Sequence, residues 1–233
     1  MRALLLGSIG TLAETSDIQR QAFNAAFAVH GLDWHWSRER YALLLLSAGG
    51  RDRIAAEAEA RGGEVDVAAL HRRKSELFQA RVREEGLSLR PGLAEALARA
   101  EAENLPVALV TTTGRANVEA VLAGLGLPTR RFALIADATQ VRAPKPAPEV
   151  YEMALRTLGV AARDALAVED NPDGAAAALA AGIACIALPG ALHRPETFPA
   201  AAERQAVLDL SERFGGAAYG AAALSTADQS TAS

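Results

Sequence analysis

The chain has 233 residues, half of them hydrophobic, which suits one globular domain or a core with a small accessory domain. Its net charge of −4 excludes the strongly basic surface of a nucleic-acid or anionic-membrane binder, so neither partner is expected. With one cysteine, no leader pattern and no apolar run of about 18 residues, we expect a soluble cytoplasmic protein without an internal disulfide.

Short apolar runs recur along the chain and alternate with helical patterns. The runs are too short for free-standing helices and are expected to be strands, at residues 2–6, 106–110, 132–136, 165–168, 185–188 and 206–210. Helices are expected at 93–104, 118–126 and 173–182. This alternation predicts an α/β, Rossmann-like parallel sheet covered on both faces, with ligands outside the carboxyl ends of its strands.

Residues 14–86 break this alternation. Ser16 is a plausible N-cap for a helix that stops at Gly31, and further helices are expected at about 37–46, 51–61 and 67–85, with no convincing strand. The sequence therefore predicts an α-helical insertion over residues 14–86. The α/β core then comprises 1–13 and 87–214, and the polar tail at 215–233 is expected to be disordered.

Polar residues follow the predicted strands where these strands end. The first strand runs into GSIGT at 7–11 and the second into TTTG at 111–114. Lys145 follows the third strand, and Glu169 and Asp170 follow the fourth. Hydroxyl and ammonium groups bind phosphate oxygens, while carboxylates hold Mg²⁺. The sequence therefore predicts a site for a phosphate and a hard cation.

Several segments resemble the haloacid dehalogenase (HAD) superfamily of phosphatases and phosphomutases. The segments VTTTGRANVEA, KPAPEVY and VEDNPDGAAAALAAG resemble the sugar-bisphosphate phosphatases of the xylulose-1,5-bisphosphate phosphatase type. HGLDWHWSRERY and GGRDRI resemble the cap of that subgroup. The resemblance covers residues 1–212. It implies a HAD core with a helical cap inserted after the first strand, and Mg²⁺-dependent hydrolysis of a sugar phosphate.

The first segment departs from the family pattern. The family has D-x-D-G-T there, in which the first aspartate attacks phosphorus and the second acts as general acid and base. In this chain the two places are occupied by Gly7 and Ile9, so no intact catalytic residue is expected. Side chains alternate along a strand, which predicts that positions 7 and 9 share one face and that Ser8 points away from the site.

The resemblance implies that six residues contact a phosphorylated small molecule or an inorganic anion. They are Thr111, Thr112, Lys145, Glu14, Arg53 and Lys74. Asp170 and Glu169 match the positions that hold Mg²⁺, and we expect weak binding because the carboxylate at position 7 is missing. Lys74 and Lys145 are the only lysines among 24 basic residues, which suggests that a phosphate-shaped site was kept. The alternative explanation is a drift too recent to have replaced them, and one sequence does not separate the two.

Each motif also has a plainer interpretation. A lysine before a proline, as at 145–146, is usually a surface turn, and an acidic pair, as at 169–170, is usually a solvated loop or a helix cap. The four histidines show no ligand spacing, and no role is expected for them: His30, His35, His71 and His193.

Three functions stay open at this point. The favoured one is a catalytically degenerate HAD protein that binds a sugar phosphate or similar anion without hydrolysing it. The second is an active phosphatase with a relocated nucleophile, Glu14 or Asp173. The third is a scaffold that binds a partner protein through its surface.

Overall fold

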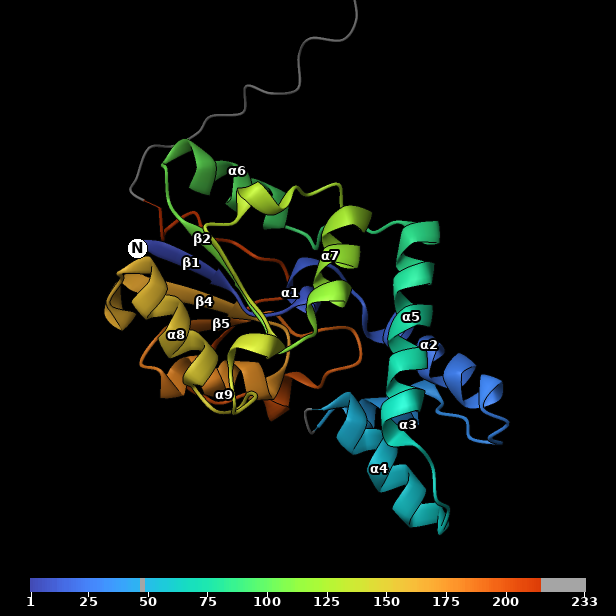
Figure 1. Ribbon diagram of the computed structural model, residues 1–233. Coiled ribbons are helices and arrows are strands. Elements are labelled where there is room, and N and C mark those ends of the chain that lie inside the picture. Colours follow the sequence, from blue (N-terminus) through green and yellow to red (C-terminus); the bar gives the residue numbers. More distant parts are fainter. Residues whose placement is uncertain (47–48, 215–233) are drawn as a thin grey trace, which may run out of the picture.

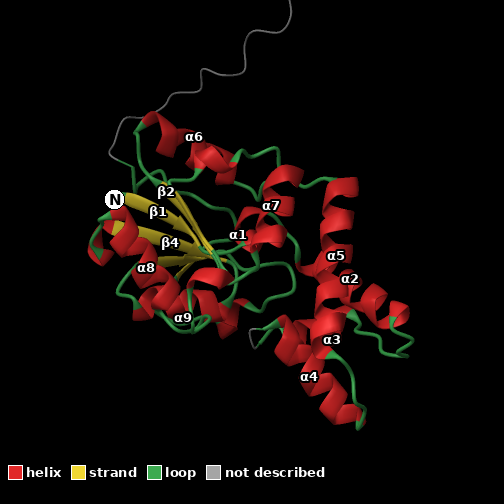
Figure 2. Cartoon of the chain, in the orientation of Figure 1, coloured by secondary structure: helices red, strands yellow, loops and turns green. Residues whose placement is uncertain are grey.

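The protein folds around a parallel β-sheet. The computed structural model describes residues 1–46 and 49–214, and Figures 1 and 2 show the sheet at the centre of these residues, with β1, β2 and β4 labelled. Within the described residues the sheet has six strands in the order β3-β2-β1-β4-β5-β6. The strands are β1 (Ala3–Leu6), β2 (Val107–Val110), β3 (Leu134–Ala136), β4 (Ala165–Glu169), β5 (Ala184–Ala187) and β6 (Glu203–Arg204). All neighbouring strands are parallel. The α/β class and the first five predicted strands are confirmed.

The sixth predicted strand, at 206–210, is wrong. The last strand is two residues long and ends at Arg204, and the segment after it crosses the start of helix α6 (Leu93–Ala102). There the Leu208 N–H donates to the Pro91 carbonyl at 3.2 Å. Gly92 has φ +84°, and a Cβ atom on it would stand 1.9 Å from the Leu208 carbonyl oxygen, so this approach requires glycine. Leu208 and Leu210 are buried by packing against helix α6, and not by pairing with another strand of the sheet.

Helices cover both faces of the sheet. Helices α6 and α7 (Arg115–Gly124) lie on one face, and α8 (Glu149–Leu158) and α9 (Pro172–Ala180) lie on the other (Figure 1). Alternate residues of β1 supply the two cores, because successive strand side chains point to opposite faces. Leu4 and Leu6 join the first core, and Ala3 and Leu5 join the second. Helix α8 is one element that the sequence patterns did not predict.

A helical segment, defined as α2 to α5, stands beyond the carboxyl ends of the strands (Figure 1). Its helices are α2 (Ser16–Val29), α3 (Arg38–Leu44), α4 (Gly50–Arg61) and α5 (Val67–Glu85). The segment has its own aromatic core, in which the Trp36 ring centroid is 4.8 Å from those of both Phe23 and Phe27. The helices predicted here are confirmed.

The N-cap of α2 lies one residue earlier than predicted. Thr15 is the capping residue, and the Glu14 carboxylate accepts the Ser16 N–H at 2.9 Å. Short 3₁₀ helices fill the remaining connections at Thr129–Arg131, Ala138–Gln140, Ala162–Asp164 and Pro195–Thr197. Across the described residues, every helix is too short or too polar to cross a membrane. The tail at 215–233 lies outside the described residues.

The strand order reverses between β1 and β4, at the centre of the sheet. Open α/β sheets bind ligands in the crevice outside the strand ends at such a switch point. Leu6 is paired with Val168, and the Gly7 N–H donates to the Val168 carbonyl at 2.8 Å. This register places the turn after β1 directly beside Glu169 and Asp170.

Candidate functional site

A cavity of about 670 Å³ lies between the carboxyl ends of the strands and the helical segment. The sheet side contributes the turns that follow the central strands, and the helical segment closes the other side. Predicted site residues that line the cavity are Gly7, Ile9, Arg53, Lys74, Thr111, Thr112, Lys145 and Asp170. Two predicted site residues, Glu14 and Glu169, are not among its lining. The fold thus brings together most of the residues that the sequence singled out.

Glu14 is engaged beside the cavity. One carboxylate oxygen accepts the Ser16 N–H, and the other accepts the Ala191 N–H at 2.6 Å. Both bonds are to backbone donors, so the side chain ties the start of α2 to the loop after β5. This arrangement explains why Glu14 does not face the cavity.

Ser8 points toward the site, and its predicted orientation is wrong. Strand β1 ends at Leu6, so the alternation of side chains does not extend to Ser8, which instead caps the short helix α1 (Ile9–Leu12). Its hydroxyl accepts the Gly10 N–H at 2.9 Å and donates to Asp170 Oδ1 at 2.5 Å. Ser8 therefore links the turn after β1 to the acidic end of β4.

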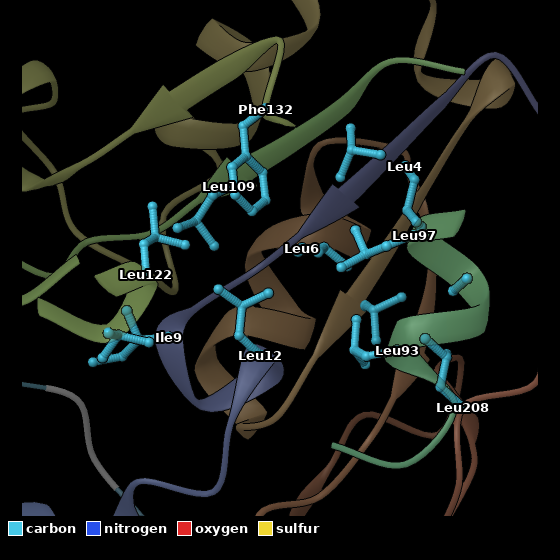
Figure 3. Packing of buried hydrophobic residues seen from close by; sticks show 14 of the residues in the cluster. Leu4, Leu6, Ile9, Leu12, Leu93, Leu97, Leu109, Leu122, Phe132 and Leu208 are labelled. Atoms are coloured by element: carbon cyan, nitrogen blue, oxygen red, sulfur yellow. The ribbon is translucent and has the colours of Figure 1, made fainter. Parts of the chain in front are cut away.

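Ile9 does not share a strand face with Gly7, for the same reason. It is the first residue of α1 and is only 4% exposed. Its side chain belongs to the apolar core that also contains Leu12 and Leu122 (Figure 3). A carboxylate at this position would therefore meet apolar neighbours as well as the cavity.

Lys145, Tyr151 and Glu169 form a buried polar cluster at the end of β4. Lys145 Nζ and Tyr151 Oη each donate to Glu169 Oε1 at 2.6 Å. Lys145 also donates to the Val110 carbonyl at 2.7 Å and to the Gly7 carbonyl. Burial raises the pKa of Glu169 although Lys145 opposes the shift, and burial beside Glu169 raises the pKa of Tyr151 well above its ordinary value.

Two glycines make room for the Glu169 carboxylate. A Cβ atom on Gly7 would stand 2.0 Å from Glu169 Cδ, and one on Gly174 would stand 2.2 Å from the same atom. Both distances are far below a van der Waals contact. The carboxylate of Glu169 therefore fills the space in which a side chain at position 7 would begin.

The acidic pair does not fit an octahedral Mg²⁺ site in this arrangement. Oε1 of Glu169 already accepts two hydrogen bonds, and its Oε2 is buried without a partner among the described residues. Asp170 Oδ1 accepts hydrogen bonds from Ser8, Thr11 and Asn171. Two carboxylate oxygens, Glu169 Oε2 and Asp170 Oδ2, accept no hydrogen bond among the described residues, and they supply only two of the six donors of an octahedral site. No group of three or more His, Cys, Asp or Glu residues that could hold a metal occurs within 1–46 and 49–214.

The opposite side of the cavity is a helical wall, defined by Arg53, His71 and Lys74. Lys74 is 5% exposed, and its Nζ donates to Gln19 Oε1 and lies 4.5 Å from the centroid of the Phe23 ring. Burial, together with the charge of Arg53, lowers the pKa of Lys74 to about 7. Burial and Lys74 lower the pKa of His71 to about 4. Arg53 and the protonated form of Lys74 bring positive charge to this wall, and Asp52 lines the cavity beside them.

Thr111 supplies a hydroxyl between the two sides. It follows β2, is 1% exposed and accepts the Thr113 N–H at 3.1 Å. Its own O–H can still donate, which suits a phosphate oxygen. Thr112 lies beside it on the cavity lining.

Sequence reasoning missed four residues of this region. His71 and His193 line the cavity, and Ser8 and Tyr151 hold the acidic pair. His71 precedes Lys74 by three residues on α5, so both lie on one helix face, and this spacing was a usable signal. Nothing in the local sequence around His193 indicates its position.

Comparisons with known proteins agree with this geometry. A family model described as haloacid dehalogenase-like hydrolase matches residues 1–182. Protein CbbY of Cereibacter sphaeroides is 42% identical over 223 residues, covering 94% of this chain and 96% of that protein. The plasmid-encoded protein CbbY of Cupriavidus necator is 44% identical over 211 residues, covering 86% and 83%.

Solved structures of CbbY from Rhodobacter sphaeroides have the same fold. A mutant in complex with xylulose-1,5-bisphosphate has a TM-score of 0.83 at 40% identity, covering 89% of this chain and 94% of that chain. A complex with phosphate has a TM-score of 0.82 at 42% identity, covering 88% and 92%. The chain is therefore a member of the haloacid dehalogenase-like hydrolase family, and it is similar along nearly its whole length to the CbbY proteins.

Proposed function

We propose that this protein binds a phosphorylated small molecule, or a similar anion, in the cavity and does not hydrolyse it. One observation carries the proposal. By the resemblance of the first segment to D-x-D-G-T, Gly7 and Ile9 stand at the places of the family's two catalytic aspartates, and the space beside Gly7 is filled by Glu169, which is itself bound to Lys145.

The chemical consequence follows from the missing groups. Without a carboxylate at position 7, no nucleophile is positioned to form a covalent phosphoryl intermediate. Without one at position 9, no positioned group protonates the leaving oxygen, a role typically worth about 10²–10⁴-fold in rate. Positioning and charge stabilisation remain, and they bind a phosphate ester without cleaving it.

The binding groups come from both sides of the cavity. Thr111 and Thr112 would donate to the phosphate, and Arg53 and Lys74 would hold its charge from the helical wall. The helical segment then acts as a cap over residues 14–86, on a core of 1–13 and 87–214. The similar CbbY protein of R. sphaeroides has been crystallised with phosphate and with xylulose-1,5-bisphosphate, which supports an anionic sugar as the ligand class.

A phosphatase with a relocated nucleophile is the second candidate, because Asp173 lines the cavity. Glu14 is the weaker choice for that role, since both of its carboxylate oxygens accept backbone N–H groups. A relocated nucleophile would have to reach phosphorus in line and within about 3–3.5 Å.

Phosphate release and ligand binding test the proposal together. The purified protein is assayed with xylulose-1,5-bisphosphate and other small sugar phosphates, with the C. sphaeroides CbbY protein as positive control. We expect no release above the buffer rate, and a rise in melting temperature with each bound phosphate ester. Release that persists after repeated purification and disappears in Asp173→Asn would contradict the proposal and establish the second candidate.

A further inference from the structure

The ammonium group of Lys145 has no donor left for a ligand. A lysine carries three N–H donors. The three acceptors around Lys145 are the Gly7 carbonyl, the Val110 carbonyl and Glu169 Oε1. The side chain is only 4% exposed, and all three acceptors lie at the ends of the central strands. Lys145 therefore borders the cavity with its charge already compensated.

Glu169 can reach this lysine because position 7 has no side chain. The carboxylate stands between Gly7 and Gly174, where a Cβ atom from either side would overlap it. Tyr151 adds a second donor to the same carboxylate oxygen. The charge of Glu169 is thus paired with Lys145 through Oε1, while its Oε2 is buried without a hydrogen-bond partner among the described residues.

The remaining carboxylate is also largely committed. Asp170 Oδ1 accepts three hydrogen bonds from side chains, and a Cβ atom on Gly10 would stand 2.1 Å from its Oδ2. Mg²⁺ requires near-ideal octahedral geometry and sheds its water reluctantly. The two carboxylate oxygens without a hydrogen bond among the described residues are Glu169 Oε2, which is buried against Gly174, and Asp170 Oδ2, which lies against Gly10. Two oxygens packed against different glycines are a poor donor set for an ion that requires six.

We propose that Glu169 stands in for the missing side chain at position 7 as the counter-anion of Lys145, and that anion binding in the cavity consequently requires no divalent cation. The ligand's charge is held by the helical wall, through Arg53 and Lys74, instead of by Lys145 and a metal. The ligand class is a phosphate ester or free phosphate with one anionic group on that wall. The binding part of this inference rests on the function proposed above, whereas the placement of Glu169 does not.

Phosphate titrations test the metal independence. Inorganic phosphate is titrated into the full-length protein by calorimetry, once with excess EDTA and once with excess Mg²⁺. We expect dissociation constants within about twofold of each other, and a loss of about tenfold or more in Lys74→Met. Binding that appears only with Mg²⁺ overturns this inference and leaves the proposed function standing, whereas no binding in either buffer overturns both.

A double-mutant cycle tests the placement of Glu169 without any ligand. Gly7→Ala is introduced into the natural chain and into Lys145→Met/Glu169→Ala, a background that removes both buried charges together and is expected to keep the fold, which its circular dichroism spectrum checks. We expect the melting temperature to fall by about 5–10 °C in the natural chain and by about 2 °C or less in that background.

The matched control is Gly63→Ala, because nothing lies within 4 Å of a Cβ atom at Gly63. It is expected to shift the melting temperature little in either background. An equal effect of Gly7→Ala in the two backgrounds overturns the placement of Glu169, whatever the titrations show.

Discussion

The two lysines of the chain sit on opposite sides of one cavity, and their surroundings differ. The strand-end corner, defined by Gly7, Lys145, Tyr151 and Glu169, pairs its lysine with a carboxylate and two carbonyls. On the helical wall, the partners of Lys74 among the described residues are the Gln19 amide and two aromatic rings. At nearly equal burial, the charge of Lys145 is therefore compensated by a carboxylate, whereas Lys74 has no such partner among the described residues.

Replacing each lysine by methionine is the sharpest way to break this comparison. Lys145→Met leaves the Glu169 carboxylate buried and unpaired, and we expect the free energy of unfolding to fall by about 3–5 kcal/mol. Lys74→Met removes a desolvated charge that has no anionic partner among residues 1–46 and 49–214, and we expect a gain of about 1 kcal/mol. Urea unfolding at pH 6.5 measures both.

The two substitutions conserve side-chain length, so each variant serves as the other's control. Equal losses in the two variants would contradict the contrast between the corner and the wall. A gain in Lys145→Met would show that Glu169 is neutral, or turned away, in the folded protein.

Anion affinity should depend on pH through the helical wall. Lys74, with its pKa lowered to about 7, is largely protonated at pH 6 and largely neutral at pH 8. Only the protonated form attracts an anion, so affinity is greatest below pH 7 and falls as the pH rises. Sulfate keeps its charge across this range, and its affinity should fall about tenfold from pH 6 to pH 8.

Lys74→Arg is the control for that titration, because arginine stays charged at every pH used. His71, with its pKa lowered to about 4, is neutral from pH 6 to pH 8 and contributes nothing to the pH dependence of the sulfate affinity. If the sulfate affinity of Lys74→Arg still falls by the same factor from pH 6 to pH 8, the pH dependence belongs to another group.

The smallest expected change in stability comes from removing the Tyr151 hydroxyl at the strand-end corner. Tyr151→Phe removes the donor to Glu169 Oε1 and should lower the free energy of unfolding by about 1–2 kcal/mol. Tyr41→Phe is the comparison on the helical side, where the tyrosine lies in the aromatic core and lines the cavity. The denaturant midpoint of Tyr151→Phe should be lower than that of Tyr41→Phe. Equal midpoints would contradict a role for Tyr151 in holding the strand-end corner.

The spacing of apolar residues along the sequence predicted most strands and helices correctly. The first five strands and the helices at 16–85 follow from short apolar runs and from three- and four-residue spacing. The run at 206–210 failed because burial against α6 gives the same apolar composition as burial in a sheet. The strand order and the cavity walls depend on tertiary contacts that no window of sequence contains.

Predictions about the site failed where they depended on side-chain direction. Ser8 and Ile9 were assigned by strand alternation, but β1 ends two residues before Ser8 and a helix begins at Ile9. The approach of Glu169 to Lys145 joins residues 24 apart, and the contact with Gly7 joins residues far more distant. Only packing in three dimensions shows that the space at position 7 is occupied.

The glycine at position 7 also limits the order in which substitutions at this corner can be tolerated. An aspartate introduced there by a single mutation would meet the Glu169 carboxylate, so this substitution is expected to be harmful on its own. Residue 169 would have to shrink or turn away first, and that change alone leaves Lys145 unpaired. This mutual dependence is a form of sign epistasis. It makes an acidic residue at position 7 hard to reach by single mutations, in whichever order they occur.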